Sequence, residues 1–157
     1  MINFFKIIFI SSFFHVSLFS HCQIPCGIYS DAMQIVQIRE DLRTIDKAME
    51  MIRNLSKNSD PQTLNQVTRW ITSKESHAQN IQKITAEYFL TQRIKQNSKF
   101  YENKLITLHQ LLVSVMKCKQ SVNKENVVKS NELLNNFTTL YFDDHGIKHL
   151  NQLDHNK

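Results

Sequence analysis

Glycine and proline are scarce in this sequence, which has only two of each among its 157 residues. Few residues therefore interrupt regular backbone structure, and this favours long helices over a turn-rich sheet. No segment concentrates charge of one sign, because the basic residues that give a net charge of +5 are scattered among acidic ones. We therefore expect no nucleic-acid partner, although the charge can still attract a small anion. The length predicts a single domain.

A long uninterrupted apolar run is also missing from residues 1–20, MINFFKIIFISSFFHVSLFS, although Phe, Ile and Leu dominate them. Serines and a histidine break the run after Lys6, which falls short of the roughly 20 apolar residues of a membrane span. One positive charge, an apolar centre and a small residue at Ser20 are typical of a cleaved leader. We therefore expect a processing peptidase to cut after Ser20, leaving His21 as the first residue and no stable membrane anchor. The alternative is an N-terminal helix that the mature protein keeps.

The composition of the leader favours export, so we expect the mature protein in the periplasm or outside the cell. The alternative is a cytoplasmic protein whose residues 1–20 are a removable propeptide. In both cases the cut precedes His21.

Apolar residues recur every three or four positions in the rest of the chain, which is the spacing of one helix face. Asp60 and Pro61 predict the N-cap and first turn of a second helix that runs to about Lys95. A third helix is predicted to begin near Ser98, and a fourth follows the polar segment SVNKEN. The inward positions are Ile35, Ile38, Leu42, Ile45, Met49 and Ile52 in the first helix, Leu64, Val67, Ile71, Ala78, Ile81, Ile84 and Tyr88 in the second, Tyr101, Leu105, Leu108, Leu112, Val115 and Met116 in the third, and Val127, Leu133, Leu134, Phe137, Leu140 and Tyr141 in the fourth.

Amphipathic helices joined by short polar links can bury one another's apolar faces. The sequence therefore predicts an all-α fold, an antiparallel four-helix bundle over residues 30–142. Residues 143–157 are expected to be a polar, loosely held C-terminal tail.

The metal-binding residue types are concentrated in residues 21–29, HCQIPCGIY. Thiolates are ligands for nickel, copper(I), zinc and iron–sulfur centres. If His21 is the first residue, its amine, the Cys22 amide nitrogen and the Cys22 sulfur can close adjacent chelate rings, and the Cys26 sulfur can return as a fourth donor. A planar set of two nitrogens and two sulfurs suits nickel(II) and matches tetrahedral zinc poorly.

Two other interpretations of the cysteines are open. In a secreted chain, the spacing of Cys22 and Cys26 alone favours a disulfide, and the protein would then be a helical-bundle binding protein without a metal. That disulfide explains neither the preceding His21 nor its position at the predicted cut. A zinc- or copper-trafficking module is the other interpretation.

The stretch HCQIPCGIY resembles the N-terminal nickel hook of the nickel-containing superoxide dismutases, whose pattern is H-C-x-x-P-C-G-x-Y. The matching positions are His21, Cys22, Pro25, Cys26, Gly27 and Tyr29. The resemblance continues more loosely in WITSKESHA and AEYF. It implies a homohexamer of four-helix bundles, each with one nickel ion held by an N-terminal hook. It also implies the disproportionation of superoxide to dioxygen and hydrogen peroxide while nickel alternates between the divalent and trivalent states.

The resemblance implies roles for individual residues. The nickel donors would be the His21 amine and imidazole, the Cys22 amide nitrogen and thiolate, and the Cys26 thiolate. Tyr29 would be the catalytic tyrosine beside the open face of the metal, where its hydroxyl can hold a water or a small anion. Gln23 stands where some members carry an acid, which changes the local charge but removes no ligand.

Residues on the helices are expected to support the axial His21 imidazole. Glu40 or Gln37 would fill the place of a glutamate on the first helix, and His77 that of a basic residue on the second. Tyr88 would be a second aromatic residue near the site. Without the resemblance, His77 would be interpreted as a surface histidine and Tyr88 as ordinary core.

Overall fold

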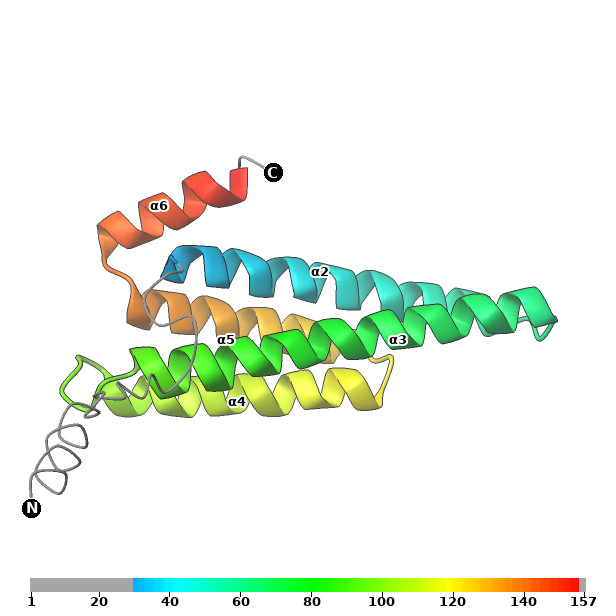
Figure 1. Cartoon of the computed structure of the whole chain (residues 1–157), viewed down its shortest axis with the longest axis horizontal. Coiled ribbons are helices and arrows are strands. Elements are labelled where there is room, and N and C mark those ends of the chain that lie inside the picture. Colours follow the sequence, from blue (N-terminus) through cyan, green and yellow to red (C-terminus); the bar gives the residue numbers. More distant parts are fainter. Residues whose placement is uncertain (1–29, 156–157) are drawn as a thin grey trace, which may run out of the picture.

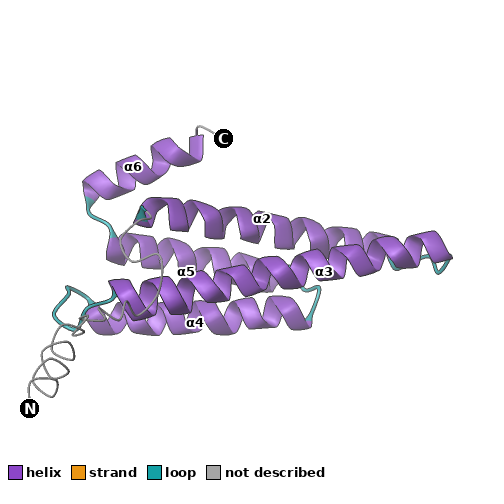
Figure 2. Cartoon of the chain, in the orientation of Figure 1, coloured by secondary structure: helices purple, strands orange, loops and turns teal. Residues whose placement is uncertain are grey.

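The computed structural model describes residues 30–155, and within them all regular structure is helical (Figures 1 and 2). The elements are α2 (Asp31–Leu55), α3 (Pro61–Lys83), the π-helix η1 (Ile84–Arg93), α4 (Tyr101–Gln120), α5 (Glu125–Tyr141) and α6 (Asp144–His155). The predicted all-α class is confirmed for this part of the chain. The predicted leader and hook, residues 1–29, lie outside the described residues. None of the described helices combines the length and apolar character needed to cross a membrane.

Helix α2 runs in the opposite direction to α3 with η1 and to α5, as the contacts between their side chains show. Asp31 at the start of α2 contacts Tyr88 in η1, whereas Asp41 further along α2 contacts His77 earlier in the chain. The same opposed order relates α2 to α5, through the pairs Asp31–Tyr141 and Asp46–Lys124. The start of α2, the end of η1 and the end of α5 therefore lie together at one end of the molecule (Figure 1).

The second predicted helix consists of two elements. As predicted, Asp60 caps the first turn of α3, and its carboxylate accepts a hydrogen bond from the Thr63 N–H at 3.0 Å. From Ile84 the winding widens into η1, which ends at Arg93. The next helix, α4, begins only after Phe100, which has a left-handed backbone conformation with φ of 56°.

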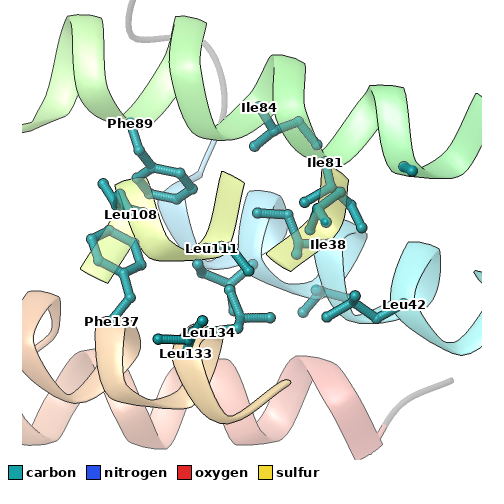
Figure 3. Packing of buried hydrophobic residues seen from close by; sticks show 14 of the residues in the cluster. Ile38, Leu42, Ile81, Ile84, Phe89, Leu108, Leu111, Leu133, Leu134 and Phe137 are labelled. Atoms are coloured by element: carbon teal, nitrogen blue, oxygen red, sulfur yellow. The ribbon is translucent and has the colours of Figure 1, made fainter. Parts of the chain in front are cut away.

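The long helices share one apolar core (Figure 3). Phe89 from η1 and Phe137 from α5 are fully buried, with ring centroids 5.0 Å apart in an edge-to-face arrangement. The ring of Tyr141 lies 5.6 Å from that of Phe89. Such aromatic pairs contribute about 0.5–1.5 kcal/mol beyond the area that they bury. The core therefore fixes η1 against α5 close to the end where the chain enters α2.

The first half of α3 departs from its predicted inward face. Leu64 is 53% exposed and Ile71 is 42% exposed. The cause is the position of α4, which ends beside Lys74: the buried Lys74 ammonium donates to the Cys118 carbonyl at 2.8 Å. The part of α3 before Lys74 consequently extends past the end of α4 beside α2 alone (Figure 1). Met116, another residue expected to point inward, is also exposed.

The expected loosely held tail is wrong for residues 144–155, which form α6 and pack against α2. Leu150 is only 1% exposed, and Leu153 packs partly buried against the same core. The Arg39 guanidinium pairs with the Asp154 carboxylate across the two helices. The prediction was wrong because the segment is mostly polar, whereas a few apolar side chains on one face are enough to pack a short helix against its neighbour.

Candidate functional site

The residues predicted to hold the metal and to stand beside it, His21, Cys22, Cys26 and Tyr29, lie outside the described residues. Their roles therefore stay predictions. The described chain begins directly after them at Ser30, the N-cap of α2. Within residues 30–155, no three His, Cys, Asp or Glu side chains are grouped so that they could hold a metal ion. The structure instead shows the start of α2, which directly follows the predicted hook in the sequence.

Asp31, Tyr88, Arg93 and Tyr141 form a polar group at the start of α2, which we call the Asp31 cluster. The Tyr141 hydroxyl donates to Asp31 Oδ2 at 2.7 Å, and Arg93 Nε lies 2.9 Å from Asp31 Oδ1. The Tyr88 hydroxyl also donates to Asp31 Oδ1. One carboxylate thus joins α2, η1 and α5, two residues after the predicted catalytic Tyr29.

The π-helical winding of η1 explains why Tyr88 and Arg93 reach the same carboxylate. In a π-helix each N–H bonds to the carbonyl five residues earlier, so side chains five apart lie above one another. The Ile94 N–H accordingly donates to the Phe89 carbonyl at 3.0 Å. Arg93 Nη2 donates to the Tyr88 hydroxyl oxygen at 2.8 Å, and the guanidinium lies 4.8 Å from the centroid of the Tyr88 ring. An α-helix would turn these two side chains away from each other.

The two phenols and the guanidinium of the Asp31 cluster keep their protons around neutral pH. Burial, followed by the hydrogen bond to Asp31, raises the pKa of Tyr88 above its usual value of 10.0. The same two causes raise the pKa of Tyr141. The hydrogen bond to Tyr88 is the main cause of a raised pKa for Arg93. Both phenols therefore remain donors, and the guanidinium remains a cation opposite the Asp31 carboxylate.

A second polar group surrounds Asp41, and we call Gln37, Asp41, His77 and Asn80 the Asp41 cluster. Asp41 is only 1% exposed. Its Oδ1 lies 2.7 Å from His77 Nδ1 and accepts from Gln37 Nε2 at 3.2 Å. Its Oδ2 accepts from Asn80 Nδ2 at 2.7 Å. These contacts compensate for the burial of a charged carboxylate, which is costly without partners.

The helix residues expected near the site have distinct surroundings. His77 belongs to the Asp41 cluster, together with Gln37, one of the two residues considered for the first helix. Glu40, the other, is half-buried, and its backbone carbonyl accepts a hydrogen bond from the Thr44 hydroxyl at 3.0 Å. The Tyr88 ring packs 5.2 Å from the Phe89 ring, as expected of a core residue, and its hydroxyl enters the Asp31 cluster. Its position near the metal stays a prediction.

Asp41 and Arg93 were not predicted from the sequence. Asp41 had a detectable signal, because it lies three residues after Ile38 and four before Ile45, on the buried face of the helix. A carboxylate at such a position requires hydrogen-bonding partners. Arg93 had no such signal, because α-helical spacing places it away from Tyr88 and only the π-helix brings the two together.

The chain matches the sequence model of the family described as nickel-containing superoxide dismutase over residues 16–145. No curated protein and no solved structure gives a significant match. The family match identifies a metalloenzyme, an oxidoreductase whose cofactor is nickel. Because the match spans most of the chain, the protein belongs to the nickel-containing superoxide dismutase family.

Proposed function

We propose that the chain disproportionates superoxide to dioxygen and hydrogen peroxide after a peptidase has removed residues 1–20. The observation that carries this proposal is the motif HCQIPCGIY, which lies within the residues matched by the family and directly follows the predicted cut. The cut matters because an internal histidine has no free amine, whereas a first-residue His21 has one.

The donor set of the hook fits one nickel ion per subunit. The His21 amine and imidazole, the Cys22 amide nitrogen and the thiolates of Cys22 and Cys26 would hold it. When bound, nickel supplies the one-electron chemistry by alternating between its divalent and trivalent states. The anionic sulfur and amide donors favour the higher oxidation state. The Tyr29 hydroxyl would hold a water or a small anion at the open face.

The helices would act as the scaffold of the hook, as an antiparallel four-helix bundle made by α2, α3 with η1, α4 and α5. The Asp31 cluster supports this role, because it fixes the first turn of α2 against η1 and α5. Six such subunits would form the homohexamer implied by the family resemblance, and sedimentation of the processed protein measures that assembly.

The mature protein would work in the periplasm or outside the cell, because the composition of residues 1–20 is that of an export signal. A removable propeptide on a cytoplasmic enzyme is the alternative. Fusing residues 1–20 to a reporter enzyme distinguishes an export signal from a propeptide, since only an export signal delivers the reporter outside the cytoplasm.

The decisive experiment compares a chain that begins at His21 with one that keeps Ser20 before it. The first should bind about one nickel ion and disproportionate superoxide, and the second should lose both properties because its residue 21 has no free amine. Full activity of the longer chain would contradict the amine-ligand mechanism.

A thiol count tests the disulfide alternative on the same metal-free protein. Cys118 is fully buried, and burial raises the pKa of its thiol, so it should not react with a thiol reagent in the folded state. Two reactive thiols per chain would therefore identify free Cys22 and Cys26. If no thiol reacts and the chain is lighter than the reduced chain by two hydrogen atoms, Cys22 and Cys26 form a disulfide. That result would support the metal-free binding protein instead.

A further inference from the structure

Helix α6 carries two histidines, His145 and His149, which are four residues apart. Residues at this spacing lie on the same face of an α-helix, with their Cβ atoms about 5–6 Å apart. Both side chains are exposed, whereas the neighbouring Leu150 is buried where α6 packs against α2. Because α6 lies beside α2 at the edge of the molecule (Figure 1), the two imidazoles are side by side on an outer surface.

The turn that carries the two histidines is held in helical form at both of its ends. Before it, the Asp143 carboxylate accepts a hydrogen bond from the Gly146 N–H at 2.8 Å, and the Asp143 carbonyl accepts one from the Ile147 N–H at 2.9 Å. After it, Leu150 is fixed in the apolar core. The fold therefore sets the spacing of the imidazoles before any ligand binds, which lowers the entropic cost of binding one.

The imidazole nitrogens of this pair are available as ligands. Within the described part of the chain, neither ring takes part in a hydrogen bond or an ion pair. Two histidines four residues apart on one helix face are a recurrent arrangement for holding one metal ion. Imidazole suits zinc, copper and nickel, whereas calcium and magnesium prefer oxygen ligands. The chemistry of the pair therefore favours a divalent transition-metal ion.

We propose that His145 and His149 form a surface site for a divalent transition-metal ion such as nickel(II), to which each residue contributes one imidazole nitrogen. Water completes the coordination, so the site needs only two protein ligands, fewer than the groups of three that residues 30–155 lack. Once the first imidazole has bound, the second binds within the same molecule, so the pair holds an ion more tightly than a single surface histidine does.

This site goes beyond the proposed function and does not depend on it. Two imidazoles make fewer bonds to an ion than the larger donor set of the hook, so the ion on α6 exchanges more readily with free metal. The nickel of the hook is therefore counted after free nickel has been removed, whereas the site on α6 is measured in the presence of free nickel.

The first test counts the nickel ions bound at equilibrium with nickel chloride, by dialysis of chains that begin at His21. The wild type should bind one ion more than the variant that combines His145→Ala with His149→Ala. Alanine favours helix at these exposed positions, so the variant should keep its fold. If the hook fails to bind nickel, which would contradict the proposed function, both counts fall equally and the difference of one ion remains. Equal counts in the two chains would overturn the proposal.

The second test measures by titration calorimetry whether the ion needs both rings at this spacing. Combining His149→Ala with Gln152→His keeps two histidines on α6 but places them seven residues apart, about 10.5 Å along the helix. Because helix side chains all tilt towards the N-terminus, these two rings cannot converge on one ion. The rearranged variant should therefore bind nickel at α6 at least about tenfold more weakly than the wild type, as His149→Ala alone should.

His109→Ala is the matched control, because His109 is an exposed histidine on α4, and this change should leave nickel affinity as it is. Wild-type affinity in the rearranged variant, or an equal loss in His109→Ala, would show an adventitious ion only, held by single histidines. Either result would overturn the proposal.

Discussion

Replacing Asp31 by Asn tests whether the Asp31 cluster fixes the start of α2. The change keeps the shape of the side chain but removes the charge that Tyr88, Tyr141 and Arg93 share. Hydrogen bonds to charged groups contribute about 1.5–3 kcal/mol, compared with about 0.5–1.5 kcal/mol for neutral ones. Each of the contacts should therefore weaken by about 1 kcal/mol.

The total loss also includes a favourable helix-dipole term of about 0.3–1 kcal/mol, because Asp31 is an acid in the first turn of α2. The side chain is 28% exposed, so water screens part of the interaction with Arg93. We expect Asp31→Asn to lower the free energy of unfolding by about 2–3 kcal/mol. Urea unfolding of the metal-free chain, followed by helical circular dichroism, measures this loss.

Glu102→Gln is the matched control, because Glu102 is an exposed acid in the first turn of α4. Glu102 contributes only the interaction with the helix dipole, so Glu102→Gln should lower the free energy of unfolding by less than about 1 kcal/mol. Tyr141→Phe should cost about 1–1.5 kcal/mol, and the double variant with Asp31→Asn should lose less than the sum. Equal losses in Asp31→Asn and Glu102→Gln would refute the argument that the cluster holds the three elements together.

Three further predictions concern the helices around the site. The folded protein raises the pKa of Tyr88 and Tyr141, so the stability that these two groups contribute should be constant below about pH 10 and should fall above it, by at most about 1.4 kcal/mol per pH unit for each tyrosine. Urea unfolding at a series of pH values should show a shallower fall for Tyr141→Phe than for the wild type. Lys74→Met keeps the apolar stem but leaves carbonyls at the end of α4 without their donor, so it should lower the free energy of unfolding in urea by about 2 kcal/mol. Lys129→Met, at an exposed lysine, should change it little. Phe100→Asn should raise the melting temperature, since the left-handed conformation costs a bulky residue about 1–2 kcal/mol and suits Asn; an unchanged or lower value would contradict that strain.

The sequence predicted the helical class and the cap of α3 because those features depend on local spacing. Asp60 and Pro61 act within one turn, and the apolar face of α2 repeats without interruption. The exposure of Leu64 and Ile71 was not predictable in the same way, because it depends on where α4 ends. The burial of Leu150 likewise depends on a contact with a helix far away in the sequence.

In the candidate site, too, the features that depend on local sequence were predictable and those that depend on contacts between helices were not. The predicted hook is a contiguous motif, so its residues could be identified from the sequence alone. The experiments described above test their roles. The partner of His77 on α3 is Asp41 on α2, which was overlooked because the other acids on α2 are half-buried and not part of the core. A charged residue inside an otherwise apolar repeat is the signal that should be followed in related sequences.

In the π-helix η1, the contact between Tyr88 and Arg93 depends on the number of residues that separate them, and not on which residues these are. Deleting one residue between Tyr88 and Arg93 would shorten their separation to four, and the segment could return to α-helical winding with the same pair still stacked. Deleting one residue after Arg93 would leave the pair unchanged but shorten the connection to α4. A change in length before Arg93 should therefore have a different effect from a change in length after it. Insertions and deletions test the role of the π-helix more directly than substitutions do.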